Sequence, residues 1–431
     1  MPVWSIYEAN DKLGKVTEIP WDRDNALTLR VYNSLSRHKE VFPRGIRSVR
    51  MFVCGPTVYD YAHLGHARTY IAFDIITRYL TFLNYSVRYL MNITDVADRI
   101  FDRAKMLNRE PSALTHEFEE AFKEDMLSLG VISIDKFERA SDHIPQVVSQ
   151  IKGLVEKGFA YETETGVYFE VAKFPKFGAL SGLSHEELSL RRLELCSTKK
   201  NPEDFSVWRK QDKEPTWESP WGKGRPGWHV EDTAISMQEL GETYDVHGGA
   251  SELMFPHHEA EIAQAEALTG KSPFVRFWLH TGLLTVGGRK MSKSLGNVIR
   301  IRDALKEYSA QELRWYFASY HYREPVNMTK SALEKSGQEF RGFMRNIKVF
   351  RKWPAQESPK NTRLNHLINQ LQAEFKRHMN DDFDTPSALE SLRNYGTRIS
   401  KLSRSSRADA RSKERAEIVV GKLLNVIGIS I

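Results

Sequence analysis

The pattern of apolar and polar positions early in the chain predicts a strand, a helix and a second strand. Residues 49–55 ("VRMFVCG") form an apolar run, and residues 87–94 ("VRYLMNIT") form another. Between them, residues 66–83 repeat apolar side chains near one face of a helix. Such a βαβ unit joins two parallel strands, and ligands bind beyond the carboxyl ends of those strands. A ligand is therefore expected beside the N-terminus of this helix.

The rest of the chain divides by similar patterns. A hairpin is predicted at 160–171, and a run rich in Pro, Trp and Gly follows at 214–229, which together indicate an insertion. Strand and helix patterns return at 243–249 and 256–270, so a split α/β core is completed late in the chain. After about residue 305 the pattern is helical. We therefore expect an α/β fold with an inserted domain and a C-terminal helical region.

Composition limits the classes to which the protein can belong. Of 431 residues, 41% are hydrophobic and 27% charged, which is ordinary for a globular protein. We expect a cytoplasmic protein with no membrane partner, because no run of about 18 apolar residues and no secretory signal pattern is present. The formal charge of +6 mildly favours a polyanionic partner. Cys54 and Cys196 are too few for a disulfide framework, so each is a buried thiol or a ligand.

The turn that opens the predicted helix reads "HLGH" and spans residues 63–66. A helix N-terminus offers unpaired N–H groups and a partial positive charge, so this turn suits a phosphate, and Gly65 allows close backbone approach. His63 and His66 could donate to developing negative charge. A tight turn with two surface histidines is the alternative.

A second motif, "GGRKMSKSLGN", occupies residues 287–297. Its flanking glycines allow a loop to close over a ligand. Lys290 and Lys293 could neutralise a triphosphate while its pyrophosphate leaves. A charged surface loop is the alternative for this motif.

Together, "HLGH" and the later "KMSKS" resemble the paired signatures of the class I aminoacyl-tRNA synthetases. The finer resemblance is to the cysteinyl-tRNA synthetase family, and it covers roughly residues 25–430. The matching blocks, in order, are "FVCGPTVYDYAHLGHARTY", "NITDVADRI", "KNPEDFSVW", "WESPWGKGRPGWHVED", "YDVHGGASELMFPHHEAEIAQAEA", "KMSKSLGN", "ASYHYR" and "DDFDTPSAL".

The resemblance implies an architecture for the whole chain. It implies a Rossmann-like parallel-sheet catalytic core, an inserted connective domain and a C-terminal α-helical bundle. The expected parts are an N-terminal extension (1–45), the first half of the catalytic domain (46–125), the connective domain (126–225), the second half with the KMSKS loop (226–305), a stem-contact region (306–328) and a tRNA-binding bundle (329–431).

The resemblance also implies an activity, in which ATP activates L-cysteine to cysteinyl-adenylate and tRNA(Cys) accepts the cysteine, releasing AMP and pyrophosphate. ATP and Mg²⁺ are the implied cofactors. Lys293 is the leading transition-state cation, with Lys290 beside it, and His63, Gly65 and His66 hold the nucleotide. The residues that resemble the cysteine site are Gly55, Thr94, Trp228 and His229. For Trp228, an ordinary core aromatic is the alternative.

The family uses a zinc ion, which prefers a thiolate to a hydroxyl and so separates cysteine from serine. The implied ligands are Cys54, Asp232, His257 and Glu261. Asp232 departs from the family pattern, which has cysteine there, so thiol selectivity is in question. A buried thiol and a helix-start pair without metal are the alternatives. We expect His258 to orient a neighbour and Cys196 to be structural or incidental.

The C-terminal part departs from the family in a second way. The typical chain continues into a small module that helps to read the anticodon, whereas this chain ends at Ile431. We therefore expect tRNA recognition to rest on the bundle of a monomer. A solvated helix face is the alternative for its basic residues Lys330, Lys335, Arg341, Arg345, Lys348, Arg351 and Lys352.

Two other functions stay open at this point. One is a ligase that joins adenylated cysteine to a small amine, similar to the mycothiol-pathway ligase. The other is a catalytically silent paralogue that binds RNA or a protein. The intact "HLGH" and "KMSKS" argue against the silent paralogue, while Asp232 keeps it open.

Overall fold

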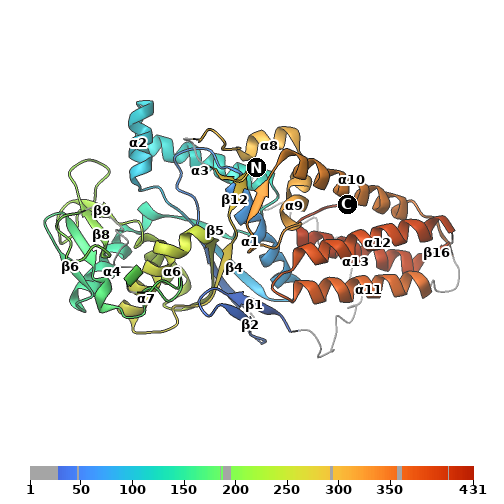
Figure 1. Ribbon diagram of the computed structural model, residues 1–431, viewed down its shortest axis with the longest axis horizontal. Coiled ribbons are helices and arrows are strands. Elements are labelled where there is room, and N and C mark those ends of the chain that lie inside the picture. The colour runs from blue at the N-terminus through green and yellow to red at the C-terminus, as the bar shows by residue number, and fades with distance from the viewer. Residues whose placement is uncertain are drawn as a thin grey trace.

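Five parallel strands form the central sheet of the protein (Figure 1). The structure is a computed structural model that describes residues 28–45, 48–184, 186–187, 196–291, 295–356, 362–405 and 407–431. In their order across the sheet, the strands are β11 (Val275–Thr281), β10 (Tyr244–Ala250), β3 (Ser48–Val53), β4 (Ser86–Ile93) and β5 (Lys136–Arg139).

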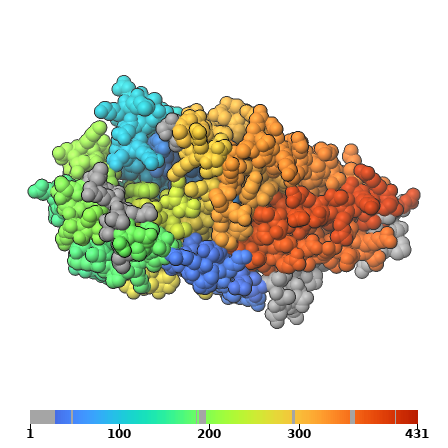
Figure 2. Space-filling model, viewed as in Figure 1, coloured from blue at the N-terminus to red at the C-terminus, as the bar shows by residue number. Residues whose placement is uncertain are grey.

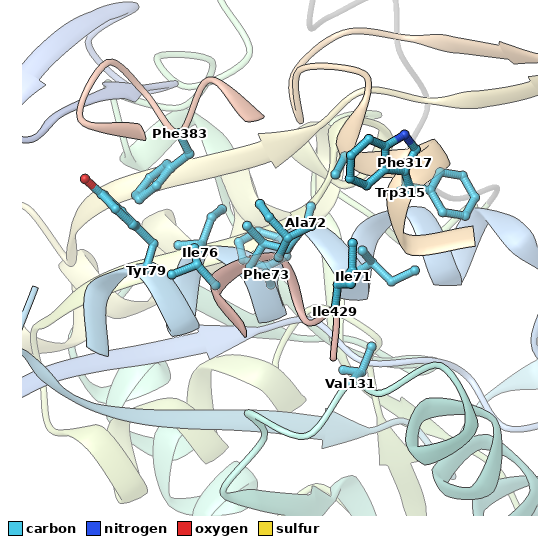
Figure 3. Close-up of a cluster of buried hydrophobic side chains, with 14 of the residues drawn as sticks. Ile71, Ala72, Phe73, Ile76, Tyr79, Val131, Trp315, Phe317, Phe383 and Ile429 are labelled. Atoms are coloured by element: carbon cyan, nitrogen blue, oxygen red, sulfur yellow. The ribbon is translucent and has the colours of Figure 1, made fainter. Parts of the chain in front are cut away.

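The βαβ unit predicted from the sequence is confirmed. Strands β3 and β4 are parallel neighbours, and α1 (Leu64–Phe82) connects them. Fourteen of the 19 residues of α1 are buried, because the sheet covers one side of the helix and C-terminal helices cover another. Figure 3 shows Ile71 and Ile76 of this helix among aromatic side chains that include Trp315 and Phe383. A helix that is apolar on most sides belongs inside a core.

The strand order creates a topological switch between β3 and β10. From β3 the chain continues to β4 and β5 on one side, and it later adds β10 and β11 on the other side. Cys54 directly follows β3, and its backbone N–H donates to the Gly248 carbonyl of β10 at 3.0 Å. In parallel α/β sheets, ligands bind beyond the carboxyl ends of the strands at such a switch.

The strand β5 was not expected from the sequence. It lies within the 126–225 range assigned to the connective domain, yet it pairs with β4 through four residues. Its sequence "KFER" carries three charged side chains and lacks an apolar run. The central sheet therefore extends into the range that was expected to be the insertion.

A second sheet forms one end of the molecule, drawn in green in Figure 1. It is antiparallel and has its own apolar cluster. Its first two strands are the predicted hairpin. The strands are β6 (Ala160–Glu162), β7 (Gly166–Phe169), β8 (Phe205–Lys210) and β9 (Gly224–Pro226).

Three helices pack between the two sheets: α4 (Ile144–Glu156), α6 (Glu231–Leu240) and α7 (Glu259–Thr269). The helix α7 begins later than the 256–270 pattern predicted, because Met254–His258 form a π-helical turn before it. This turn places His257 and His258 at the entrance of the helix.

The other end of the molecule is helical, as predicted (Figure 1). The short strand β14 (Val326–Met328), which was not expected, pairs with β12 (Leu284–Val286) and interrupts the helices. The helices are α8 (Ile301–Glu307), α9 (Ala310–Ala318), α10 (Lys330–Arg351), α11 (Thr362–Met379), α12 (Thr385–Ser405) and α13 (Ala410–Ile427).

Smaller elements complete the described chain. They are β1 (Arg30–Asn33), β2 (His38–Val41), α2 (Asp98–Leu107), α3 (Pro111–Ser128), β13 (Arg289–Lys290), β15 (Ala355–Gln356) and β16 (Ala408–Asp409). Within the described ranges, no helix combines the length and the apolar character needed to cross a membrane.

Candidate active site

The turn at residues 63–66 caps the N-terminus of α1 with its two imidazoles. His63 Nδ1 accepts from the Gly65 N–H at 3.1 Å, and His66 Nδ1 lies 3.3 Å from the His63 N–H, which it can accept. The two rings are stacked, with centroids 4.0 Å apart. Burial lowers the pKa of His66 well below its ordinary value, and His63 lowers it further. The turn therefore caps a helix end whose partial positive charge favours an anion, and its His66 ring is neutral.

The loop with the two lysines starts and ends beside this turn. The Leu64 N–H donates to Ile299 O at 2.9 Å, and the Ile301 N–H donates to Ala62 O at 3.0 Å. A Cβ added to Gly65 would lie 3.2 Å from Cε of Met291. Met291 and the 299–301 segment, which lie on either side of the undescribed residues 292–294, are therefore neighbours of the "HLGH" turn.

The structure describes only one of the two lysines expected to act on the phosphates. Lys293 lies outside the described residues. Lys290 is exposed, and its Nζ lies 2.6 Å from Glu252 Oε2. That ion pair is exposed on both sides, so it is weak enough for a ligand phosphate to compete with it.

Six buried side chains with metal-binding donor atoms surround the end of β3. Cys54 Sγ lies 3.3 Å from Asp232 Oδ2, and the same oxygen lies 3.0 Å from His257 Nε2. Glu261 Oε1 is 3.2 Å from His257 Nε2. The structure thus brings the four expected ligands together. We call the whole group the strand-end cluster, and it consists of Cys54, Asp232, His247, His257, His258 and Glu261.

Separate elements supply these side chains. Cys54 follows β3, and His247 lies within β10 on the other side of the switch. Asp232 lies in the first turn of α6, and Glu261 lies in the first turn of α7. Carboxylates are favoured at those positions because the helix dipole is positive there. The i to i+4 spacing places His257 and Glu261 on one side of the chain, as expected.

The strand-end cluster holds acidic groups in a buried place. Burial raises the pKa of the Cys54 thiol well above its ordinary value, and the charges of Asp232 and Glu261 raise it further. Burial also raises the pKa of Glu261, with Asp232 adding to the effect. Burial lowers the pKa of His247 and His258 well below the usual range. All four of these shifts oppose charge in the absence of a cation.

The donors of this cluster fit a metal ion such as zinc. Glu261 Oε2 is buried and, among the described residues, has no hydrogen-bond partner. Within the described ranges, Asp232 and Glu261 form ion pairs with histidines and none with Lys or Arg. Two four-residue groups, each with sulfur, nitrogen and oxygen donors, lie close enough to share an ion. Zinc binds such mixed sets.

Asn92 connects the expected cysteine-site residues to this cluster. Its Oδ1 accepts from the Gly55 N–H at 2.6 Å. Its Nδ2 lies 3.3 Å from Thr94 Oγ1 and donates to Asp232 Oδ1 at 2.7 Å. A Cβ at Gly55 would lie 1.7 Å from the Asn92 carbonyl oxygen, so only glycine fits there. Gly55 and Thr94 therefore lie at the edge of the cluster.

Trp228 and His229 cover the cluster from another side. The Trp228 ring stacks on His257 with centroids 4.4 Å apart, although 41% of the Trp228 surface is exposed. His229 is buried, and its Nδ1 lies 3.0 Å from His257 Nδ1. Trp228 is therefore not an ordinary core aromatic. It forms the boundary between the buried donors and solvent.

Sequence reasoning missed Asn92 and His247 as members of this site. Asn92 lies at the carboxyl end of β4, two residues before Thr94, and His247 lies in β10 beside the switch. Both positions are polar residues near the carboxyl ends of strands that flank β3. That combination was visible in the sequence once the strand order is known.

Comparison with known proteins identifies the class to which this fold and site belong. Residues 41–338 match the family model for tRNA synthetases class I (C), catalytic domain. The structure of methionyl-tRNA synthetase from Mycobacterium tuberculosis in complex with methionyl-adenylate has a similar fold, with a TM-score of 0.63, 15% identity, and coverage of 89% of this chain and 90% of that one. The chain is a class I aminoacyl-tRNA synthetase.

Curated relatives define the particular family within that class. The cysteine–tRNA ligase of Thermococcus onnurineus is 45% identical over 379 residues, which cover 85% of this chain and 79% of the relative. The cysteine–tRNA ligase of Pyrococcus horikoshii is 45% identical over 388 residues, covering 87% of this chain and 80% of the relative. The chain belongs to the cysteine–tRNA ligase family.

Proposed function

We propose that the protein uses ATP to convert L-cysteine to cysteinyl-adenylate and then transfers the cysteine to tRNA(Cys), releasing AMP and pyrophosphate. One observation carries this proposal. A buried cluster of thiol-preferring metal donors and a capped phosphate-binding helix end both follow β3, at the switch of a parallel sheet. That arrangement would hold the sulfur of a bound cysteine on one side of the switch and the phosphates of a nucleotide on the other, so that the carboxylate can reach the nucleotide.

The nucleotide end of the site would work by positioning and charge. His63, Gly65 and His66 would hold the phosphates of ATP, together with Mg²⁺, at the N-terminus of α1. Lys293 and Lys290 would neutralise the charge that develops as pyrophosphate leaves. The neighbouring 62–64 and 299–301 segments support this assignment, because they bring the loop to the turn.

The cysteine end of the site would select the substrate by its sulfur. When bound, zinc would supply a Lewis acid that prefers a thiolate to the hydroxyl of serine. Gly55, Thr94, Trp228 and His229 would surround the rest of the amino acid. The residues that would hold the ion facing the substrate are Cys54, Asp232, His257 and Glu261.

The remaining parts of the chain would serve the tRNA. Residues 306–328 would contact the acceptor stem, and the helices of residues 329–431 would bind the tRNA body. We further propose a cytoplasmic monomer in which Cys196, in the 126–225 connective region, plays no part in catalysis. Membership of the cysteine–tRNA ligase family supports a role in tRNA binding for the parts outside the catalytic core.

Exchange of pyrophosphate into ATP tests the first half-reaction. We expect the exchange to require cysteine and to fall about 100- to 1,000-fold in Lys293→Ala, the usual effect of removing one transition-state donor. Lys271→Ala, which removes an exposed lysine outside the site, is the control. Absence of exchange with every amino acid tested would contradict the proposal and favour the silent paralogue.

The acceptor is tested separately with radiolabelled cysteine. We expect the label to appear on tRNA(Cys) in an unfractionated tRNA pool. Label found on a small amine and not on tRNA would contradict the tRNA assignment and favour the small-amine ligase. The first half-reaction would still stand in that case.

A further inference from the structure

The strand-end cluster contains two overlapping ligand sets that share Cys54 and Glu261. His247 Nε2 lies 3.3 Å and His258 Nε2 lies 3.1 Å from Cys54 Sγ, and Glu261 Oε1 lies 4.0 Å from the same sulfur. Within each set, one donor atom per residue lies within 4.8 Å of the others. The inner set is Cys54, His247, His258 and Glu261, and the outer set is Cys54, Asp232, His257 and Glu261.

The inner set has its imidazoles already oriented. His247 Nδ1 lies 2.6 Å from the Tyr244 hydroxyl oxygen. His258 Nδ1 lies 2.8 Å from His280 Nε2, and His280 Nδ1 lies 2.8 Å from Ser34 Oγ. If every Nδ1–H donates outward along these contacts, the Nε2 lone pairs of His247 and His258 both face the thiol. Histidines that ligate metals are held in this way through their second nitrogen.

The two sets differ in their donor atoms. The inner set offers two nitrogens, whereas the outer set offers one nitrogen and a second carboxylate oxygen. Zinc favours nitrogen and sulfur donors. All members of both sets are buried, and Asp232 stays inside the cluster whichever set binds the ion. The preference for the inner set therefore rests on its nitrogen donors.

The outer pair has other partners that keep it in place without a metal. Asp232 accepts from Asn92 Nδ2 at 2.7 Å and lies 3.0 Å from His257 Nε2. His257 also contacts His229 and stacks under Trp228. Asp232 and His257 are therefore satisfied as a hydrogen-bonded pair on the side of the cluster that faces Trp228.

We propose that zinc rests in the inner set when no cysteine is bound, while Asp232 and His257 remain paired with each other. The proposal deepens the proposed function and rests on its placement of zinc in the strand-end cluster. It makes His258 a ligand and replaces the expectation that this residue only orients a neighbour. It also gives the chain a way to retain zinc with an aspartate at a position where the family pattern has cysteine.

Metal content of the full-length protein tests the proposal. His258→Asn and His247→Asn remove Nε2 while the asparagine amide can keep the contact of Nδ1 with His280 or Tyr244. Asp232→Asn is the matched variant of the outer set, and its Oδ1 can still accept from Asn92. Zinc per chain is measured after dialysis against a graded series of chelator concentrations. The visible spectrum of the cobalt(II) form gives a second readout of the thiolate and nitrogen ligands.

The inner set predicts opposite results for the two kinds of variant. Zinc affinity should fall at least about tenfold in His258→Asn and His247→Asn, since even loss of an outer partner commonly costs about 10- to 100-fold. Asp232→Asn should stay within about twofold, with an unchanged cobalt spectrum. The circular dichroism and thermal unfolding of each variant are compared with those of wild type. If one histidine variant does not fold, the zinc affinity of the other histidine variant tests the proposal.

Three results would overturn the inner set. These are loss of zinc in Asp232→Asn with retention in both histidine variants, equal loss in all three, or no zinc in wild type. Cysteine-dependent pyrophosphate exchange by wild type is measured in parallel. If wild type shows this exchange but the zinc contents of the variants differ from the expected ones, zinc binding by the inner set is rejected and the proposed activity stands.

Discussion

At the scale of single residues, Asp232 contacts three groups of the site through its two carboxylate oxygens. Oδ1 accepts from Asn92, and Oδ2 lies 3.3 Å from Cys54 Sγ and 3.0 Å from His257 Nε2. A thiolate at this place would be a softer donor with a higher affinity for zinc than the carboxylate has. A cysteine at position 232 would therefore let the outer set bind zinc more strongly than the wild-type cluster does.

We expect Asp232→Cys to retain zinc more strongly than wild type, by at least about tenfold in the chelator concentration needed to remove half of the metal. The added thiolate would give the cluster two sulfur donors. Metal content after chelator dialysis checks this, with Asp245→Cys, which changes a half-buried aspartate bonded to Arg50 outside the site, as the control. Equal retention in wild type and Asp232→Cys would contradict the expectation.

Asn92 is the other residue on which the site depends. In Asn92→Ala, the Gly55 N–H and an oxygen of Asp232 lose buried partners, so we expect a loss of about 1–3 kcal/mol in the free energy of unfolding. The KM for cysteine should rise because the Asn92 side chain contacts Gly55, Thr94 and Asp232, and the KM for ATP should change little. Urea unfolding and pyrophosphate exchange measure these effects.

Asn369→Ala is the matched control, because Asn369 is an exposed residue of α11 that accepts from Arg415. It should change the free energy of unfolding by less than about 0.5 kcal/mol. Similar losses in both variants, or a rise in the KM for ATP alone, would show that Asn92 does not organise the cysteine end.

The sequence was sufficient for only some members of this site. The four expected zinc ligands could be named because each lies in a continuous block that resembles the cysteinyl-tRNA synthetase family, and His257 and Glu261 also have an i to i+4 spacing. These ligands are Cys54, Asp232, His257 and Glu261. Asn92 and His247 could not be named, because their meeting depends on the register of β10 and β4 against β3. That register is fixed by contacts between segments far apart in the chain.

At the scale of elements, the pattern of apolar residues predicted the helices and strands whose own side chains form an apolar run or a helical repeat. The helix α1 and the strands β3 and β4 each bury a run of apolar residues, so their ends agreed with the expectation within about two residues. The strands β5 and β14 are short, and the first is mostly charged. They are strands because a neighbouring strand pairs with them, and this tertiary effect leaves no local pattern.

A buried ion pair joins α1, which packs on the central sheet, to the C-terminal helix α9. Arg314 of α9 contacts Asp74 of α1 at 2.5 Å, and its Nε donates to Ile427 O at the end of α13. Burial alone would raise the pKa of Asp74, but Arg314 and then Arg78 bring it below its ordinary value of 3.8. Ionised Asp74 therefore stabilises the fold above about pH 3.8, which is the ordinary pKa of this carboxyl and applies to the unfolded chain. This stabilisation is lost as the pH falls through the lower pKa that Asp74 has in the folded protein.

We expect Arg314→Met to lower the free energy of unfolding at pH 7 by about 3–5 kcal/mol, because it leaves a buried carboxylate short of a partner. The difference in the free energy of unfolding between wild type and the variant should narrow below pH 3.8, where Asp74 of the unfolded chain begins to protonate. Urea unfolding across this pH range measures both effects. Arg393→Met, which breaks the partly exposed pair with Glu339, is the control and should cost less than about 1 kcal/mol.

At the scale of the whole molecule, α6 and α7, which carry part of the strand-end cluster, and the long C-terminal helices lie in different parts of an elongated shape (Figure 1). Figure 2 shows the same elongated outline. The helix α10 buries an apolar stripe that includes Phe340 and Ile347. Its basic side chains, Arg345 and Lys348 among them, are exposed. This exposed basic face is the surface at which we propose that the tRNA binds.

The double variant Arg345→Gln/Lys348→Gln tests whether this surface binds the tRNA. We expect its KM for tRNA to rise and the slope of log affinity against log salt concentration to fall by up to about 2, one for each lost phosphate contact. Cysteine-dependent pyrophosphate exchange should not change, because that reaction uses no tRNA. Lys152→Gln/Lys213→Gln makes the same charge change on exposed residues of the 126–225 region and is the control. Equal effects in both double variants would mean that net charge, and not this face of α10, attracts the tRNA.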